Sequence, residues 1–166
     1  MKKLFFLGAL ILFLAACTNV NFVSPQPEFV DALTEIPEKY HGEFLIDKDW
    51  DQKTHTVTSS TINGISISSD SLIVKERGDY FYINTMNDSG YYELRIIRLI
   101  KFLNHESISL YTPGLDNIDQ LKLFNVVSSF NPEDDDVDEL VLDNVSVNQL
   151  SILTNSSEKY KVTRLK

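Results

Sequence analysis

Hydrophobic and polar residues alternate through the middle of the chain, a pattern typical of half-buried β-strands. Several such runs are separated by turn signals, among them Arg77-Gly78 and the segment 87–90. Short alternating runs joined by turns predict hairpins, so we predict an antiparallel meander over residues 42–112. The runs are 42–46, 55–62, 71–76, 79–85 and 108–111.

Residues 91–103 fit two structures. Their apolar side chains recur at helical spacing, with Arg95, Arg98 and Lys101 on the opposite face, which favours a helix. The flanking turns and the bulky β-forming residues favour a strand. We predict a strand for this segment, with the helix as the alternative.

The last third of the chain has a mixed pattern. Residues 116–124 have apolar residues at roughly helical spacing, and 137–142 is a short β-like run. Ser146 and Gln149 match a capping box, which predicts a short helix over 147–154. The final run, 160–165, predicts a closing strand.

Composition changes this picture little. Beyond residue 16 the chain contains one alanine, Ala32, while β-branched and aromatic residues are abundant. Because alanine is the best helix former, this balance favours sheet. We therefore predict a mainly β fold, or an α+β fold, with one or two short helices in the last third. A length of 166 residues suits one domain.

Charge and cysteine content exclude several classes of function. The chain has 24 acidic and 15 basic residues and a net charge of −9. A general nucleic-acid binder needs a basic surface, so no nucleic-acid partner is expected. A single cysteine excludes an internal disulfide framework and a cysteine-based zinc site.

The N-terminus has the pattern of an export signal. Lys2 and Lys3 precede an apolar run over 4–16, which ends directly before Cys17. A membrane-spanning helix needs about 20 apolar residues, so this run is too short to span. Its length fits the hydrophobic region of a secretory signal peptide.

The segment Leu14-Ala15-Ala16-Cys17 resembles the lipobox of bacterial lipoproteins. The resemblance implies cleavage before Cys17 and attachment of diacylglycerol to its sulfur, with acyl chains such as palmitate. It predicts a signal peptide at 1–16, a lipidated tether at 17–30 and one β-rich domain at 31–166. The implied location is the cell envelope. Thr18, where an inner-membrane lipoprotein would carry Asp, favours the periplasmic face of the outer membrane in a Gram-negative cell.

A dense acidic run lies near residue 135. It includes Asp134, Asp135 and Asp136, and it lacks the Gly and Glu that a calcium-binding EF-hand loop requires. We predict no metal site there. The run is a candidate contact for a basic protein partner, because charge complementarity speeds association.

No catalytic pattern stands out. The chain has no Gly-x-Ser-x-Gly elbow, no His-Glu-x-x-His frame and no phosphate-binding glycine loop. We therefore predict that the protein is not an enzyme and uses no cofactor. An envelope hydrolase remains a secondary alternative.

A second resemblance concerns the start of the domain. Tyr40-His41-Gly42-Glu43-Phe44 is similar to the first strand of lipocalins, although Phe44 stands where lipocalins have Trp. The resemblance implies that Phe44 is a core anchor covered by Arg164, in a small barrel. The chain lacks a clear lipocalin-type Thr-Asp-Tyr segment, and its mixed last third differs from eight plain strands.

Together these observations lead to one main functional prediction. We expect a membrane-anchored envelope lipoprotein that acts as a non-enzymatic binding or interaction module, with an envelope protein as partner. The alternative is a lipocalin-like carrier of a small apolar ligand. An enclosed apolar cavity would favour the carrier, and a filled core with an exposed apolar patch would favour the interaction module.

Overall fold

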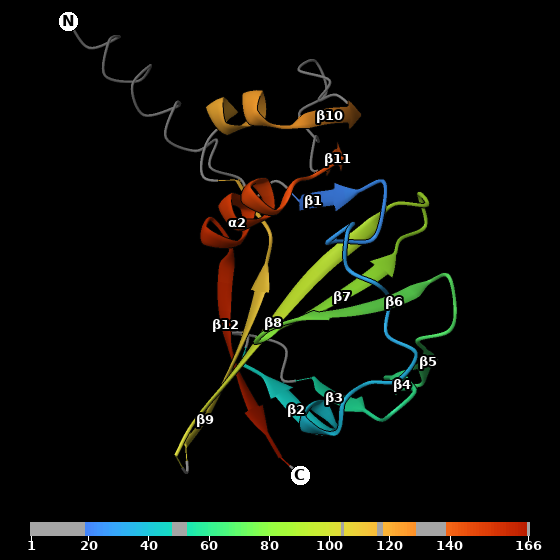
Figure 1. Ribbon diagram of the computed structural model, residues 1–166, viewed down its shortest axis with the longest axis vertical. Coiled ribbons are helices and arrows are strands. Elements are labelled where there is room, and N and C mark those ends of the chain that lie inside the picture. The colour runs from blue at the N-terminus through green and yellow to red at the C-terminus, as the bar shows by residue number, and fades with distance from the viewer. Residues whose placement is uncertain (1–18, 48–52, 104, 116–117, 129–138, 166) are drawn as a thin grey trace, which may run out of the picture.

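The computed structural model describes residues 19–47, 53–103, 105–115, 118–128 and 139–165. Most of these residues lie in strands of one sheet, so the predicted mainly β fold is confirmed (Figure 1). The strands are β1 (Asn19–Phe22), β2 (Gly42–Ile46), β3 (Thr54–Val57), β4 (Thr61–Ile62), β5 (Ile65–Ser66), β6 (Leu72–Arg77), β7 (Tyr80–Met86), β8 (Tyr92–Phe102), β9 (His105–Thr112), β10 (Asn125–Ser128), β11 (Glu139–Asp143) and β12 (Glu158–Arg164). The helices are the 3₁₀ turns η2 (Glu38–Tyr40) and η3 (Ile118–Leu123) and the α-helix α2 (Val147–Asn155).

The antiparallel meander predicted over 42–112 forms in two parts, β2 to β5 and β6 to β9, and β5 does not pair with β6. Strands β6, β7, β8 and β9 pair antiparallel in sequence order. Gly78 adopts a left-handed φ of 62° in the β6–β7 turn, a conformation that favours glycine. The side chain of Asn87 accepts hydrogen bonds from the backbone N–H groups of Ser89 and Tyr91, which closes the β7–β8 turn.

Strand β8 resolves the ambiguity of residues 91–103 in favour of a strand. Leu94 and Ile96 pack into one core, while Leu99 and Ile97 pack into another on the opposite face. Because both faces are covered, apolar residues occupy neighbouring as well as alternate positions. This double burial produced the helix-like spacing in the sequence.

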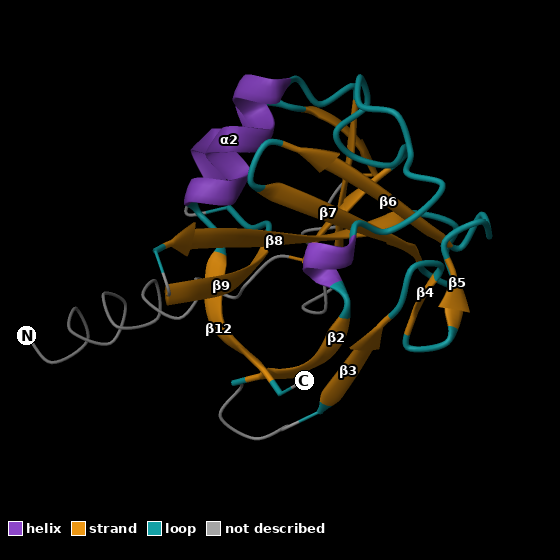
Figure 2. Ribbon diagram, turned by 60° about the horizontal axis from the view of Figure 1, so that its bottom comes forward, coloured by secondary structure: helices purple, strands orange, loops and turns teal. Residues whose placement is uncertain are grey.

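The sheet curls strongly around β8 (Figure 2). Its hydrogen-bonded order is β10-β11-β1-β8-β9-β12-β2-β3-β4-β5, and the β6–β7 hairpin joins it through β8. Among the described strands, β5 and β6 do not pair. The sheet is therefore not closed, and the small barrel that the lipocalin resemblance implied is wrong. Side chains from β2, β3, β7, β8, β9 and β12 nevertheless line one space on the concave side of the sheet.

The predicted tether is wrong for residues 19–30. Strand β1 lies between β11 and β8 in the sheet, and Phe22 is completely buried. Beyond it, Asn84 bonds both the N–H and the C=O of Gln26, at 2.6 and 2.9 Å. Lys75 Nζ donates to the carbonyls of Pro25 and Pro27, at 2.8 and 2.9 Å. The segment is therefore part of the folded domain.

The last third contains the predicted short helix and an additional strand. In α2, Ser146 accepts from the Gln149 N–H, and the Gln149 side chain accepts from the Ser146 N–H, so the capping box is present. The run at 116–124 forms the 3₁₀ turn η3 instead of an α-helix, and β10 follows it. Asp116 and residues 137–138 lie outside the described residues, while β11 and β12 correspond to the other two predicted strands.

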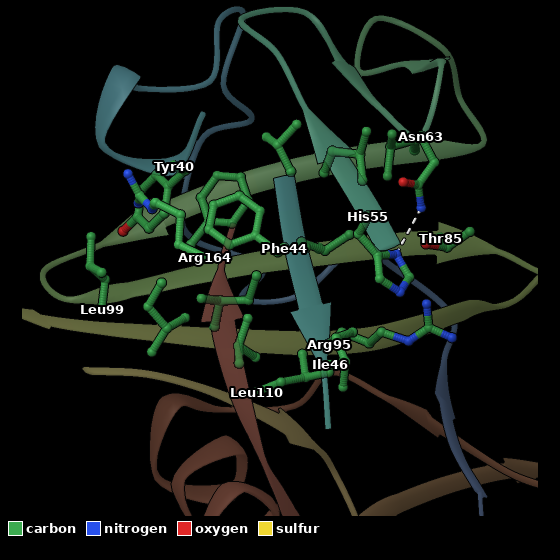
Figure 3. Close-up of a pocket in the computed structure, with 18 of the residues that line it drawn as sticks. Tyr40, Phe44, Ile46, His55, Asn63, Thr85, Arg95, Leu99, Leu110 and Arg164 are labelled. Carbon is green, nitrogen blue, oxygen red and sulfur yellow. Dashed lines mark hydrogen bonds between the residues drawn. The ribbon is translucent and has the colours of Figure 1, made fainter. Parts of the chain in front are cut away.

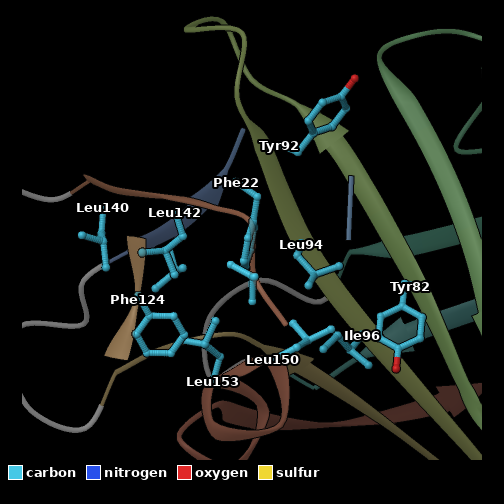
Figure 4. Packing of buried hydrophobic residues seen from close by; sticks show 12 residues of the cluster. Phe22, Tyr82, Tyr92, Leu94, Ile96, Phe124, Leu140, Leu142, Leu150 and Leu153 are labelled. Atoms are coloured by element: carbon cyan, nitrogen blue, oxygen red, sulfur yellow. The ribbon is translucent and has the colours of Figure 1, made fainter. Parts of the chain in front are cut away.

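Two cores lie on opposite sides of β7 and β8. One packs α2 and β11 against β1, with Phe22, Leu142 and Leu153 completely buried (Figure 4). The other fills part of the concave side of the sheet and includes Ile36, Val74 and Phe81. The second core encloses the site described next.

Candidate functional site

A cavity of about 160 Å³ lies on the concave side of the curled sheet (Figure 3). Its wall is almost entirely aliphatic and aromatic. The lining residues are Tyr40, Phe44, Ile46, His55, Val57, Ile62, Asn63, Ile65, Leu72, Phe81, Ile83, Thr85, Arg95, Ile97, Leu99, Ile108, Leu110, Val162 and Arg164.

The strand period explains why these residues line one space. Successive strand residues point to opposite faces, so Phe81, Ile83 and Thr85 of β7 share the concave face. Tyr80 and Tyr82 point instead to the other core. The same alternation in β8, β9 and β12 contributes the remaining apolar wall.

One end of the cavity is closed by aromatic packing. Tyr40, from η2, is buried and stacks on Phe81 with ring centroids 4.4 Å apart. Its hydroxyl donates to Glu76 Oε1 at 3.2 Å. Burial, with the negative charge of Glu76 as a second cause, raises the pKa of Tyr40 well above its usual value. The Tyr40 hydroxyl therefore stays protonated, and the ring, stacked on Phe81, closes this end of the cavity.

Phe44 and Arg164, which the lipocalin resemblance paired, lie together at this closed end. They are aligned across β2 and β12, and the guanidinium carbon of Arg164 lies 5.1 Å from the centre of the Phe44 ring. Arg164 also donates to the carbonyl of Lys39 in η2 and lies 3.1 Å from Glu106 Oε1 of β9. Phe44 is half-buried and packs against the core of the concave side.

The other end of the cavity has a polar rim. His55, Asn63, Thr85 and Arg95 gather there, as Figure 3 shows. Asn63 Nδ2 lies 2.9 Å from His55 Nδ1, and half of the Arg95 side chain is exposed. Asn63 and Ile65 are exposed as well, whereas Tyr40 and Phe81 at the closed end are buried. This gradient places the entrance at the polar rim.

This arrangement is suited to binding. An apolar wall stabilises a ligand by removing apolar surface from water, and a few polar groups at the entrance orient it. In the described part of the chain, no three His, Cys, Asp or Glu side chains gather as metal ligands. Among the described lining residues, His55 is the one histidine, and none is a serine or cysteine.

The other predicted site residues lie outside the described residues. These are the lipid attachment residue Cys17 and the acidic residues Asp134, Asp135 and Asp136. Sequence reasoning missed the rim residues His55 and Arg95. Alternation in β3 and β8 could have placed them on the concave face, but nothing local indicates that this face stays partly unfilled.

Comparisons with known proteins assign this chain to no family. The chain matches no protein-family model, no curated protein and no solved structure. Within the described ranges, every helix is too short or too polar to cross a lipid bilayer.

Proposed function

We propose that this protein is a lipoprotein anchored through Cys17, whose β domain binds a small apolar ligand in the concave cavity. The anchor is supported by the lipobox-like segment that ends at Cys17. The binding role is supported by the apolar cavity with one closed end and one polar rim. Of the three roles considered from the sequence, an interaction module, a ligand carrier and an envelope hydrolase, the cavity favours the ligand carrier.

The size of the cavity limits the ligand. An engineered apolar cavity of roughly 150 Å³ in another protein stays dry and accepts benzene. The present cavity, at about 160 Å³, fits one aromatic ring or a short branched alkyl group. Because the entrance carries Asn63, Thr85 and Arg95, the preferred ligand has a polar group attached to that apolar body.

Ligand binding is tested with the chain from residue 18 onward, which keeps every described element. Para-cresol serves as the probe because it combines one apolar ring with one hydroxyl. At 100 times its dissociation constant, a ligand of the native state adds about 2.7 kcal/mol of stability. For a domain of this size, that raises the melting temperature by roughly 5–10 °C.

A variant pair separates cavity binding from surface adsorption. Ile83→Phe enlarges a side chain in the cavity wall and is expected to remove the cresol-dependent shift. Ile100→Phe changes an exposed residue of β8 that does not line the cavity and is expected to retain it. Saturable binding that is equal in the two variants, or no binding in the unmodified chain, would contradict the proposed carrier role.

The anchor is tested separately in cells. Cys17→Ser removes the sulfur to which the diacylglycerol would attach, so lipid labelling and cleavage before residue 17 should both stop. Mass spectrometry of the membrane-extracted protein gives the measurement. A mature N-terminus carrying an unmodified Cys17 thiol would contradict the anchor.

A further inference from the structure

The folded domain begins two residues after the proposed anchor. Strand β1 starts at Asn19 and is held on both sides, by β11 in parallel and by β8 in antiparallel pairing. Farther along, Asn84 and Lys75 hold residues 25–27. Strand β1 is therefore fixed to the rest of the domain and adds no length to the connection between Cys17 and the fold.

The short connection limits how far the domain stands from the bilayer. Two residues extend over at most about 7 Å. The order β10-β11-β1 places the edge strand β10 two strand spacings to the side of β1, roughly 10 Å, and the register sets Val126 level with Phe22, at the end of β1 away from Asn19. A lipid chain on Cys17 consequently holds this end of the sheet against the membrane surface.

This end of the molecule exposes aliphatic side chains. Leu123 at the end of η3 is 53% exposed, and Val126 and Val127 of β10 are 36% and 52% exposed. The pairing of β10 with β11 shifts register between Val126 and Ser128, which leaves Val127 out of the ladder. In Figure 1, β10 and the coil before it form one end of the long axis, and β2 and β3 lie toward the other.

We propose, on the basis of the Cys17 anchor proposed above, that η3 and β10 form a membrane-contact edge that lies flat on the bilayer surface. Leu123, Val126 and Val127 enter the headgroup region, as apolar side chains of interfacial segments do. The net charge of the whole sequence is −9 and becomes more negative when cleavage removes Lys2 and Lys3, which disfavours anionic lipid, so the surface contacted is a zwitterionic one. The concave cavity then lies on the side away from the bilayer.

The orientation is tested on the mature lipoprotein in phosphatidylcholine vesicles. Cys17 is the chain's single cysteine and would be blocked by its lipid, so an added cysteine is the one reactive thiol. Val127→Cys reports on the membrane-contact edge. Leu103→Cys, at an 85% exposed position after β8, is the matched control. Each carries an environment-sensitive dye, and headgroup-region spin-labelled lipid is the quencher.

The expected result is several-fold stronger quenching at position 127 than at position 103. Equal quenching at the two positions, or none at position 127 in vesicle-bound protein, overturns the proposed edge and leaves the anchor intact. Failure of the protein to float with vesicles, together with an unmodified Cys17, overturns the anchor and with it the edge. Flotation and mass spectrometry thus separate the two failures.

A charged residue introduced into the membrane-contact edge provides a second test of the proposal. Leu123→Glu adds a carboxylate where the proposal places lipid, and it is expected to lower quenching at position 127 by at least half. Ile100→Glu places the same charge at a residue of β8 that is 41% exposed and should leave quenching unchanged. Quenching that Leu123→Glu leaves unaltered would exclude an apolar contact at this edge.

Discussion

At the scale of single residues, Arg164 of β12 connects three other elements of the described structure. It contacts the Phe44 ring of β2, the Lys39 carbonyl of η2 and the Glu106 carboxylate of β9. The ion pair with Glu106 is partly exposed, and such pairs typically contribute less than about 1 kcal/mol. The guanidinium also covers the Phe44 ring, where the long side chain excludes water.

Phe44→Ala is expected to destabilise the domain by about 3 kcal/mol, the lower part of the range for phenylalanine truncation, because the ring is half-buried. Urea denaturation gives the measurement. Phe29→Ala, at a 65% exposed position, is the control and should change the free energy of unfolding little. An unchanged midpoint in Phe44→Ala would show that the ring contributes nothing to the closed end of the cavity.

Because Tyr40 is buried, we expect the folded domain to lose stability at alkaline pH. Burial raises its pKa in the folded state above the unfolded value of 10.0. The neutral phenol is preferred by the folded state, so its stabilisation is complete below pH 10 and is lost as the pH rises through the folded pKa. The slope attributable to this group reaches at most about 1.4 kcal/mol per pH unit.

Comparison with Tyr40→Phe isolates this effect, measured by urea denaturation between pH 8 and pH 11. The variant should lose stability less steeply above pH 10. Burial lowers the pKa of Lys75, which acts in the opposite sense, and burial raises the pKa of Tyr82 and Tyr92. These groups are common to both proteins and cancel in the comparison. Identical slopes would show that Tyr40 is not shielded from water.

At the scale of elements, the N-terminal segment is held by polar contacts inside an apolar setting. Asn84 is completely buried and bonds the Gln26 N–H and C=O, as a neighbouring strand would, and also the Ile73 carbonyl. Lys75 is buried as well, and its ammonium group donates to two carbonyls of the same segment. Buried polar groups need such partners, because an unmade hydrogen bond costs about 1–3 kcal/mol.

Asn84→Leu keeps the size of the side chain and removes these bonds. The buried N–H and C=O of Gln26 then lack a partner, so we expect a loss of at least about 2 kcal/mol. Hydrogen exchange should become faster over residues 20–27 before it changes in β8 and β9. Asn148→Leu, at an exposed position of α2, is the control. Unchanged exchange over residues 20–27 in Asn84→Leu would mean that β1 and Lys75 hold the segment without Asn84.

At the scale of the whole molecule, β7 and β8 join the two cores. Ile97 and Leu99 face the cavity side, and Leu94 and Ile96 face α2 and β11. A strand with both faces buried cannot lose one core without exposing apolar surface from the other. The two halves are therefore expected to unfold together, as single domains of this size usually do.

Leu153→Ala tests this coupling from the α2 side. Leu153 is completely buried, so its truncation should cost about 3–5 kcal/mol. No tryptophan belongs to either core among the described residues, so exchange of amides in β2 and β12 reports on the cavity side and exchange in β11 on the α2 side. Protection should fall by the same factor on both sides. A loss confined to β11 would show two separately folding units.

The sequence by itself determined the local structure of this protein. Alternation and turn residues predicted the meander over 42–112, and Ser146 with Gln149 predicted the start of α2, because these features depend on neighbours a few residues apart. The tertiary structure alone decided that residues 19–30 belong to the folded domain, since the partners of that segment, Asn84 and Leu142, lie far along the chain. It also decided the cavity. A period of two assigns side chains to a face, but only the curvature and pairing of distant strands determine whether the space between those side chains is filled.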